Sequence, residues 1–271
     1  MRGERKRWNR APTLFRAGIM AKQTEIELPD GSCIPILYED RAVLAIDKPA
    51  GWMLAPDSWD RTSRNLQLAL RSSVNAGDYW ARSRRLKYIR FVHRLDADTS
   101  GVLLLAKSAG ALHAYSRLFQ SRRVEKVYLA VVRGIPPRQD WVCRLKLAPD
   151  PGEAGRTRVK AQGGKESETR FHVVKTGKGT ALIEARPLSG RTHQIRVHLA
   201  ESGYPVLGDV LYGTDLASPQ PTTRHSSLFP IALRAVALSY PDPFQRKLVR
   251  IQAPVEEFCR SFGFFWPAPG P

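Results

Sequence analysis

The sequence predicts an α+β fold in which a mixed, mostly antiparallel β-sheet is flanked by helices, and two observations lead to this prediction. Segments with the character of β-strands outnumber segments with a helical pattern along the 271 residues. Many of these strands are separated by short turns rich in Gly, Pro and Asp, which is typical of hairpins. A doubly wound parallel sheet is therefore not expected.

The first elements are expected close to the N-terminus. Residues 26–40, IELPDGSCIPILYED, alternate around a Pro-Asp-Gly turn and predict a hairpin. Residues 42–54, AVLAIDKPAGWML, predict a buried strand that ends in a Lys-Pro-Ala-Gly turn. Residues 61–75 are rich in leucine and predict a helix.

A second strand and helix are expected next. Residues 102–106 are uniformly apolar and predict a buried strand. Ser108 follows this strand, and a serine hydroxyl can cap a helix by accepting a hydrogen bond from a backbone N–H of the first turn. The predicted helix has an apolar stripe made of Leu112, Tyr115, Leu118 and Phe119.

The second half of the chain is expected to be mostly strand. Residues 125–134 predict a strand that is closed by Gly134 and a Pro-Pro turn. The further predicted elements are two paired strands around Gly177 and Gly179 in residues 165–188, a helix in 191–204 that ends near Gly203, and a final hairpin in 234–254.

The composition favours a polyanionic partner. Lys and Arg number 43 against 25 Asp and Glu, which gives a net charge of +18. Such a charge is most often matched to nucleic acid. No apolar run approaches the roughly 20 residues of a membrane helix, so no membrane association is expected. The cysteines are scattered and odd in number, which predicts reduced thiols and a cytoplasmic location.

The domain organisation is expected to be simple. Residues 1–28 are basic and predict a flexible arm that adds phosphate contacts. Residues 29–266 predict one catalytic domain, and residues 267–271 a short tail. The arm lacks the apolar centre of a secretory signal.

The most informative stretch is FVHRLDADTSGVLLLAKS, residues 91–108, which carries Asp96 and Asp98. It follows residues 81–94, which contain six Lys or Arg and no acid. Local chemistry leaves four interpretations open: a metal site, a glycosidase acid pair, a single nucleophile, or a hydrogen-bonded turn. A metal site would need further ligands such as His93 or His193, and the basic surroundings favour a phosphate-bearing substrate.

A second informative stretch covers residues 185–213. A Ser-Gly turn exposes Arg191 at the start of a helix, and free backbone amides beside an Arg can bind an anion. Arg191 and Arg196 are five positions apart, so at most one is expected to point into a given pocket. His193 and His198 are candidate acid/base groups, although a structural, hydrogen-bonded role is commoner.

A third candidate is Tyr128, which lies in a predicted strand. An aromatic residue on a strand usually belongs to the core, but in a nucleic-acid enzyme it can stack on a base.

Together these stretches resemble a known family, the RluA-type RNA pseudouridine synthases. The similar motifs are IDKPAGW at 46–52, HRLDADTSG at 93–101, EKVYLAVVRG at 125–134, GRTHQIRVHLAESGYPVLGDVLYG at 190–213 and ALRAVALSYPDP at 232–243. The resemblance covers roughly residues 37–258 and implies the pseudouridine synthase fold. It also implies conversion of specific uridines to pseudouridine in structured RNA, either rRNA or tRNA.

The resemblance implies a role for each candidate residue. Asp96 would be the single catalytic carboxylate, acting as a nucleophile or as the base that starts glycal formation, with Asp98 left to the turn. Arg191 would pair with Asp96 through a charge-assisted hydrogen bond. Tyr128 would stack on the target uracil and assist removal of the C5 proton, and Arg94 would fill the stack that the flipped base vacates. The other expected substrate-binding residues are Ile195, His93, Thr99 and Arg196.

The implied chemistry needs no cofactor and no metal, because the isomerisation involves neither net redox change nor hydrolysis. RNA is the expected partner, and a monomer without an obligate protein partner is expected. Two alternatives remain: a non-catalytic RNA-binding protein on the same fold, and a metal-dependent nuclease that uses Asp96 and Asp98.

Overall fold

The computed structural model describes residues 23–54, 64–213 and 231–266. In these residues the strands form one 12-stranded sheet in the order β1-β2-β3-β5-β11-β6-β10-β9-β7-β8, with β12 paired to β11 and β4 to β5. The strands are β1 Glu25–Glu27, β2 Cys33–Glu39, β3 Val43–Lys48, β4 Arg90–Phe91, β5 Ser100–Ala106, β6 Glu125–Arg133, β7 Asp140–Pro149, β8 Thr157–Val159, β9 Lys165–Thr176, β10 Thr180–Pro187, β11 Leu233–Pro241 and β12 Leu248–Gln252. The helices are α1 Leu66–Ala76, α2 Tyr79–Arg82, α3 Ala109–Gln120, α4 Gln194–Glu201 and α5 Glu256–Ser261.

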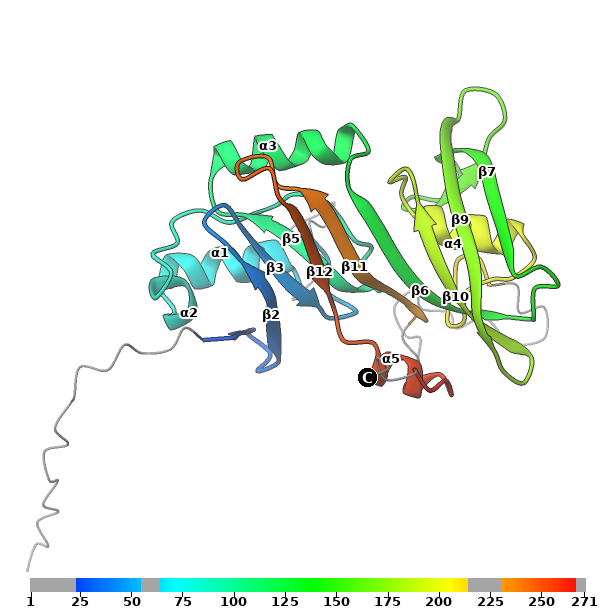
Figure 1. Ribbon diagram of the computed structural model, residues 1–271, viewed down its shortest axis with the longest axis horizontal. Coiled ribbons are helices and arrows are strands. Elements are labelled where there is room, and N and C mark those ends of the chain that lie inside the picture. Colours follow the sequence, from blue (N-terminus) through cyan, green and yellow to red (C-terminus); the bar gives the residue numbers. More distant parts are fainter. Residues whose placement is uncertain (1–22, 55–63, 214–230, 267–271) are drawn as a thin grey trace, which may run out of the picture.

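The predicted fold class is confirmed, because the sheet is mixed and mostly antiparallel. Among the named strands, β5 and β11 pair in parallel, and the other pairs are antiparallel. Figure 1 shows the sheet running across the molecule, with α3 beside β5, α4 beside β7 and β9, and α1 and α2 next to each other. The sheet is therefore covered by helices on part of its surface and left open elsewhere.

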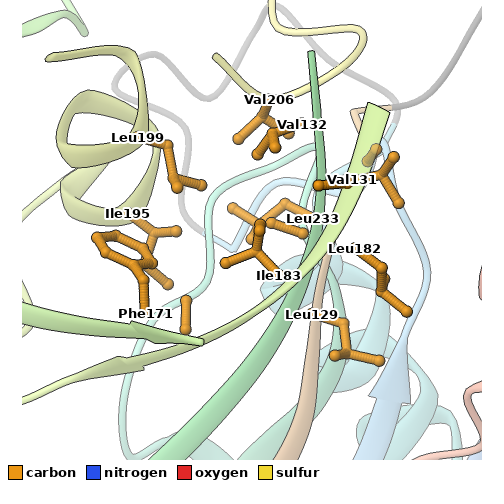
Figure 2. Packing of buried hydrophobic residues seen from close by; sticks show 14 of the residues in the cluster. Leu129, Val131, Val132, Phe171, Leu182, Ile183, Ile195, Leu199, Val206 and Leu233 are labelled. Carbon is orange, nitrogen blue, oxygen red and sulfur yellow. The ribbon is translucent and has the colours of Figure 1, made fainter. Parts of the chain in front are cut away.

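Strand β5 is buried on both faces, which explains its uniformly apolar sequence. Because side chains alternate along a strand, Leu103 and Leu105 pack with α1 and α2, whereas Val102 and Leu104 pack with α3. A third cluster joins α4 to β6, β9 and β10. Figure 2 shows Ile195 and Leu199 of α4 facing the strands of this cluster. The cluster fixes α4 against the sheet.

The predicted hairpins are found in the sheet, and the predicted helices correspond to α1, α3 and α4. Ser108 caps α3, because its hydroxyl accepts a hydrogen bond of 3.1 Å from the N–H of Ala111. The stripe of α3 is buried at Tyr115 and Leu118. Strands β4, β7 and β8 and helices α2 and α5 were not expected from the sequence. Most side chains of β7 are exposed or half-buried, so its apolar pattern is weak.

The N-terminal boundary differs from the prediction. Residues 25–27, which were assigned to the arm, form β1 and pair with β2. Residues 1–22 of the predicted arm and the predicted tail at 267–271 lie outside the described residues. None of the described helices combines the length and the apolar character that crossing a membrane requires.

Gly101 makes the parallel contact between β5 and β11 possible. Its φ is +111°, and a Cβ at this position would lie 2.0 Å from the carbonyl oxygen of Ala235. Only glycine accommodates both this backbone angle and this close approach. The contact places the turn that precedes β5 next to β11 and β6.

Candidate active site

The turn that carries Asp96 is held by a buried lysine. The N–H of Thr99 donates to the carbonyl of Asp96 across 3.2 Å, which closes the turn. Lys48 is fully buried, and its Nζ donates to the carbonyls of Pro49, Ala97 and Thr99 at 2.9, 2.6 and 2.9 Å. Its ammonium has three N–H donors and all are satisfied by backbone. The Lys-Pro-Ala-Gly turn thus fixes the backbone around Asp96.

The two carboxylates of this turn have different surroundings. Asp96 is partly buried and lines a cavity of about 70 Å³, whereas Asp98 is exposed and does not line it. Burial lowers the pKa of Lys48 to about 8, although the charges of Asp98 and Asp96 act to raise it. Asp96 is therefore the acid of this turn that can meet a bound molecule in the cavity.

Arg196 is fixed by Asp209 and faces Asp96. Its Nε and Nη2 donate to the two carboxylate oxygens of Asp209, both at 2.7 Å. Its Nη1 lies 3.9 Å from Oδ2 of Asp96. Burial lowers the pKa of Arg196, but the hydrogen bonds and charge of Asp209, together with Asp96, outweigh burial and raise it. A permanently charged guanidinium is thus held rigidly beside Asp96.

His193 approaches the same carboxylate from another side. Its Nε2 lies 4.0 Å from Oδ2 of Asp96, and its Nδ1 lies 3.0 Å from the hydroxyl of Tyr212. That hydroxyl also accepts the N–H of Thr157 at 2.8 Å. Burial lowers the pKa of His193 more than Asp96 raises it, so the imidazole is neutral at pH 7. Because the Tyr212 hydroxyl retains its own proton to donate, it favours the tautomer with hydrogen on Nε2.

Tyr128 and Ile195 supply the apolar part of the cavity. Tyr128 is in β6 beside Ala185 and Ala235, which are small and leave room around its ring. Burial first, and the charge of Asp96 second, raise the pKa of Tyr128, so its hydroxyl stays protonated at neutral pH. Ile195 packs into the α4 cluster and also lines the cavity. Both side chains lie where a planar base beside Asp96 would contact them.

The comparison with family models is decisive for identity. The model described as RNA pseudouridylate synthase matches residues 42–201, which include the turn of Asp96, Tyr128 and all of α4. This chain belongs to the RNA pseudouridylate synthase family. The resemblance to its RluA-type members, expected from the motifs, is confirmed.

Individual pseudouridylate synthases are also similar. The Ribosomal large subunit pseudouridine synthase C of Escherichia coli (strain K12) is 35% identical over 228 residues, which cover 82% of this chain. The chain spans 66% of the length of that relative. The solved structure of Human RNA Pseudouridylate Synthase Domain Containing 1 has a TM-score of 0.63 and 28% identity, covering 82% of this chain and 83% of that one. Human RNA Pseudouridylate Synthase Domain Containing 4 shares the fold, with a TM-score of 0.64 and 22% identity, covering 81% of this chain and 87% of that one.

In this chain the cation beside Asp96 differs from the expected one. Arg191 was expected to pair with Asp96, but its Nε donates to the carbonyl of Glu166 at 3.2 Å. Helix α4 begins at Gln194, so Arg191 precedes the helix, whereas Arg196 lies on its buried face. Arg196, expected as a substrate-binding residue, takes the position assigned to Arg191.

His93 also differs from its expected position. Its Nε2 accepts the N–H of Leu104 at 3.1 Å, and its ring stacks on Phe119 with centroids 4.7 Å apart. It does not line the cavity, so the structure gives no support to a substrate contact. The other expected residues, Arg94 and Thr99, do line it. His198 has the structural role that is usual for histidine, with Nε2 at 2.9 Å from the hydroxyl of Ser167.

Three residues of this site were not singled out from the sequence. Asp209 and Tyr212 belong to the GDVLYG end of the quoted motif, which was the available signal. Lys126 lines the cavity and donates to the carbonyl of Ser189 at 2.7 Å. Among the described residues, no three His, Cys, Asp or Glu side chains are grouped so that they could hold a metal ion.

Proposed function

We propose that this protein converts uridine to pseudouridine in RNA and that Asp96 is its single catalytic carboxylate. The main support for the proposal is the set of residues that line the cavity. Asp96 is the acidic residue among the described residues that line it, and it faces the Nη1 of Arg196 and the Nε2 of His193. The names of the curated relatives favour ribosomal RNA of the large subunit as the substrate.

The reaction requires one carboxylate in a fixed position. The bond between N1 and C1′ breaks, and a bond between C5 and C1′ forms, with no net gain or loss of water or electrons. Asp96 can act as the nucleophile at C1′ or as the base that starts glycal formation. Arg196 orients the carboxylate in either route, since its own position is fixed by two hydrogen bonds to Asp209.

The target base must leave its stack to reach Asp96. Flipping a nucleotide costs a few kcal/mol, and contacts to the flipped base and to the remaining stack offset this cost. Tyr128 and Ile195 would contact the uracil ring. Arg94 is exposed at the cavity and would occupy the vacated stack. The uracil loses a proton at C5 and gains one at N1, so no net proton is lost. Because the hydroxyl of Tyr128 is protonated at neutral pH, it would assist this transfer as a hydrogen-bond donor to the base and not as the group that accepts the C5 proton.

The proposal also covers the location, the oligomeric state and the partner of the protein. The protein would act in the cytoplasm as a monomer, on RNA and without a cofactor. The evidence for RNA is the net charge of +18 together with the family.

The test compares two variants of the same turn. Asp96→Asn should abolish pseudouridine formation in vitro, with a loss of at least about 1,000-fold, because an amide cannot replace the carboxylate. Asp98→Asn should keep most of the activity, because Asp98 is outside the cavity. Pseudouridine mapping of total rRNA and tRNA, from cells with and without the gene, would identify the substrate.

Three results would overturn the proposal. Normal turnover by Asp96→Asn would remove its catalytic role, and loss of activity in Asp98→Asn alone would indicate the other acid. Cleavage of the RNA that is abolished by EDTA would favour the metal-dependent nuclease.

A further inference from the structure

A second groove is found at the opposite end of β5 from Asp96. It has a volume of about 570 Å³. Strand pairing places the turn between β2 and β3 beside the end of β5, because Val43 is opposite Ala106. The turn of Asp96 precedes the other end. Since β5 has 7 residues that each rise about 3.3 Å, the groove lies roughly 20 Å from the catalytic turn. The lining residues are Glu39, Asp40, Arg41, Arg84, Arg85, Leu86, Lys87 and Lys107.

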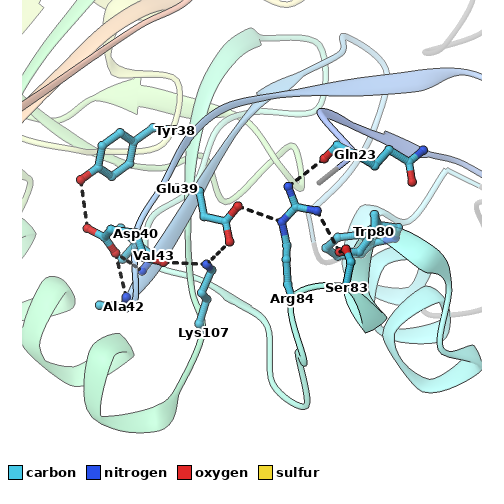
Figure 3. A network of polar contacts seen from close by, with 10 residues as sticks. All are labelled: Gln23, Tyr38, Glu39, Asp40, Ala42, Val43, Trp80, Ser83, Arg84 and Lys107. Carbon is cyan, nitrogen blue, oxygen red and sulfur yellow. Dashed lines mark hydrogen bonds and ion pairs between the residues drawn. The ribbon is translucent and has the colours of Figure 1, made fainter. Parts of the chain in front are cut away.

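The two acidic residues of the groove already accept hydrogen bonds from other groups of the protein. Glu39 accepts hydrogen bonds from Nε of Arg84 at 2.9 Å and from Nζ of Lys107 at 2.6 Å. Asp40 accepts the backbone N–H groups of Ala42 and Val43 at 2.7 and 2.8 Å. Figure 3 shows these contacts as one network. The network fixes the walls of the groove and engages both carboxylates.

Three cations of the groove remain for a ligand. Arg41, Arg85 and Lys87 are exposed, and within the described residues none of them has a hydrogen-bonded or ion-paired side chain. The groove is therefore positively charged, and its apolar lining is limited to Leu86. Small-molecule sites are mostly apolar, whereas a groove of exposed cations suits the phosphates of a nucleic-acid backbone.

The groove and the catalytic cavity are joined by one chain segment. Residues 84–87 line the groove, and Arg94 lines the cavity. Between them, β4 pairs with the end of β5, with Arg90 opposite Ala106. Leu86 and Leu95 also pack into the same hydrophobic cluster. The basic segment 81–94 therefore connects the groove to the cavity, and its β4 part lies beside β5.

We propose that this groove binds the RNA backbone at a distance from the target uridine, through Arg41, Arg85 and Lys87. The inference rests on the proposed function, because it assumes that the RNA bound in the groove is the substrate whose uridine reaches Asp96. A DNA duplex rises about 3.4 Å per base pair and an A-form RNA duplex rises less, so a separation of roughly 20 Å corresponds to at least about six base pairs of RNA. RNA that extends less far on this side of the target cannot reach the groove.

The experiment uses two RNAs and two triple variants of the full chain. One RNA carries about four base pairs beside the target uridine, and the other carries at least about twelve. The first duplex is shorter, and the second longer, than the roughly six base pairs needed to reach the groove. The test variant is Arg41→Gln, Arg85→Gln and Lys87→Gln together. The control, Arg138→Gln, Lys175→Gln and Lys178→Gln together, removes the same charge from exposed positions near the β6–β7 and β9–β10 turns. Affinity, turnover and the unfolding temperature are measured over a salt series.

The test variant should bind the long RNA roughly tenfold more weakly, and the slope of log K against log salt should decrease by about 2 to 3, one phosphate contact for each cation. Binding of the short RNA, kcat at saturation and the unfolding temperature should not change. An equal loss on both RNAs, a loss as large in the control, or no loss would each overturn the proposal. If the wild type forms no pseudouridine in either RNA, the proposed function fails, while the affinities still decide whether the groove binds RNA.

Discussion

Arg196 holds its Nη1 3.9 Å from Oδ2 of Asp96 while its other two nitrogens bind Asp209. The side chain of Asp209 is fully buried and that of Arg196 is 5% exposed, so the pair is shielded from solvent. A planar guanidinium can satisfy one carboxylate with two parallel hydrogen bonds and still present its remaining nitrogen to another. The geometry therefore needs Arg at this position.

Replacing Arg196 by Lys keeps the positive charge but removes this geometry. An ammonium cannot bind Asp209 through two parallel bonds and face Asp96 at the same time. We expect the free energy of unfolding to fall by about 2 kcal/mol, which is the usual size for hydrogen bonds to a charged group. We expect kcat to fall about 100-fold, because Asp96 loses the guanidinium that orients it. This fall corresponds to about 2.7 kcal/mol of lost transition-state stabilisation. Single-turnover kinetics and urea unfolding measure the two effects.

Arg191→Lys is the matched control. Among the described residues Arg191 makes one side-chain hydrogen bond, to the backbone carbonyl of Glu166. Arg191 is half-buried and lines the cavity, but Arg196 is the arginine whose guanidinium approaches Asp96. Lys keeps the positive charge at position 191, so we expect kcat to change by about threefold or less, which corresponds to less than about 0.7 kcal/mol. A larger loss in Arg191→Lys than in Arg196→Lys would restore the pairing that was expected from the sequence.

Local sequence patterns were sufficient to predict part of the fold. The apolar run at 102–106, the cap at Ser108 and the hairpin turns each depend on neighbouring residues, and all are found. These predictions succeed because the interactions that decide them are close in the sequence. Asp96 was singled out by the family resemblance of its motif, and the structure places its side chain at the cavity.

The choice between Arg191 and Arg196 could not be made in this way. It depends on where α4 begins, and the residue before the helix, His193, has the left-handed φ of +53°. Because a helix turns about 100° per residue, a shift of its start changes which side chain faces the cavity. Asp209 and Tyr212 could not be assigned either, since their contacts depend on the loop after α4 returning to the sheet. Tertiary packing decides both points.

Tyr212→Phe should test whether the hydroxyl contact positions His193. Phe keeps the ring over the guanidinium of Arg196, whose Cζ lies 5.1 Å from the ring centroid. It leaves the buried N–H of Thr157 without its acceptor, which should cost about 1–3 kcal/mol of stability. We expect kcat to fall about tenfold with little change in KM, because His193 loses the hydrogen bond that orients its ring toward Asp96. A tenfold fall corresponds to about 1.4 kcal/mol of lost transition-state stabilisation. Steady-state kinetics at saturating RNA measure the change.

Tyr204→Phe is the control for Tyr212→Phe. In the described part of the chain the hydroxyl of Tyr204 has no hydrogen-bond partner, although its ring packs near Trp141. Its removal should leave kcat and stability nearly unchanged. Equal effects of the two substitutions would show that the contact of Tyr212 with His193 has no special role.

Stability should fall as the solution becomes acidic, in part because of His198. This side chain is fully buried, and burial lowers its pKa from 6.5 to about 4. Between these pH values the unfolded chain binds a proton that the folded chain does not, so lowering the pH favours unfolding. The expected contribution is about 1.4 kcal/mol per pH unit from about pH 6.5 down to about pH 4.

Urea unfolding at pH 7 and pH 5 would measure this contribution. In His198→Gln the difference between the two pH values should be smaller than in the wild type by about 2 kcal/mol. His113→Gln, at an exposed position on α3, should retain the wild-type difference. An unchanged difference in His198→Gln would show that this histidine is protonated in the folded protein.

Gly101→Ala adds one methyl group near the site and should strongly lower the stability of the protein. The new Cβ would meet the carbonyl oxygen of Ala235 at 2.0 Å, and φ of +111° is unfavourable for alanine. Because the obstacle is backbone, β5 and β11 must separate, and the turn of Asp96 must move with them. We expect a loss of at least about 3 kcal/mol, the range of overpacking with added backbone strain, and a fall in kcat in the fraction that folds.

Gly110→Ala makes the same chemical change, but it is expected to raise the stability of the protein slightly. Gly110 lies in the first turn of α3, and a Cβ there would meet nothing within 4 Å. Alanine is favoured over glycine in a helix by about 0.5–1 kcal/mol, so this variant should be slightly more stable and equally active. Thermal and urea unfolding of the two variants separate the explanations. Similar stability in both would mean that β5 and β11 can part without cost, and the turn of Asp96 would then not depend on glycine at position 101.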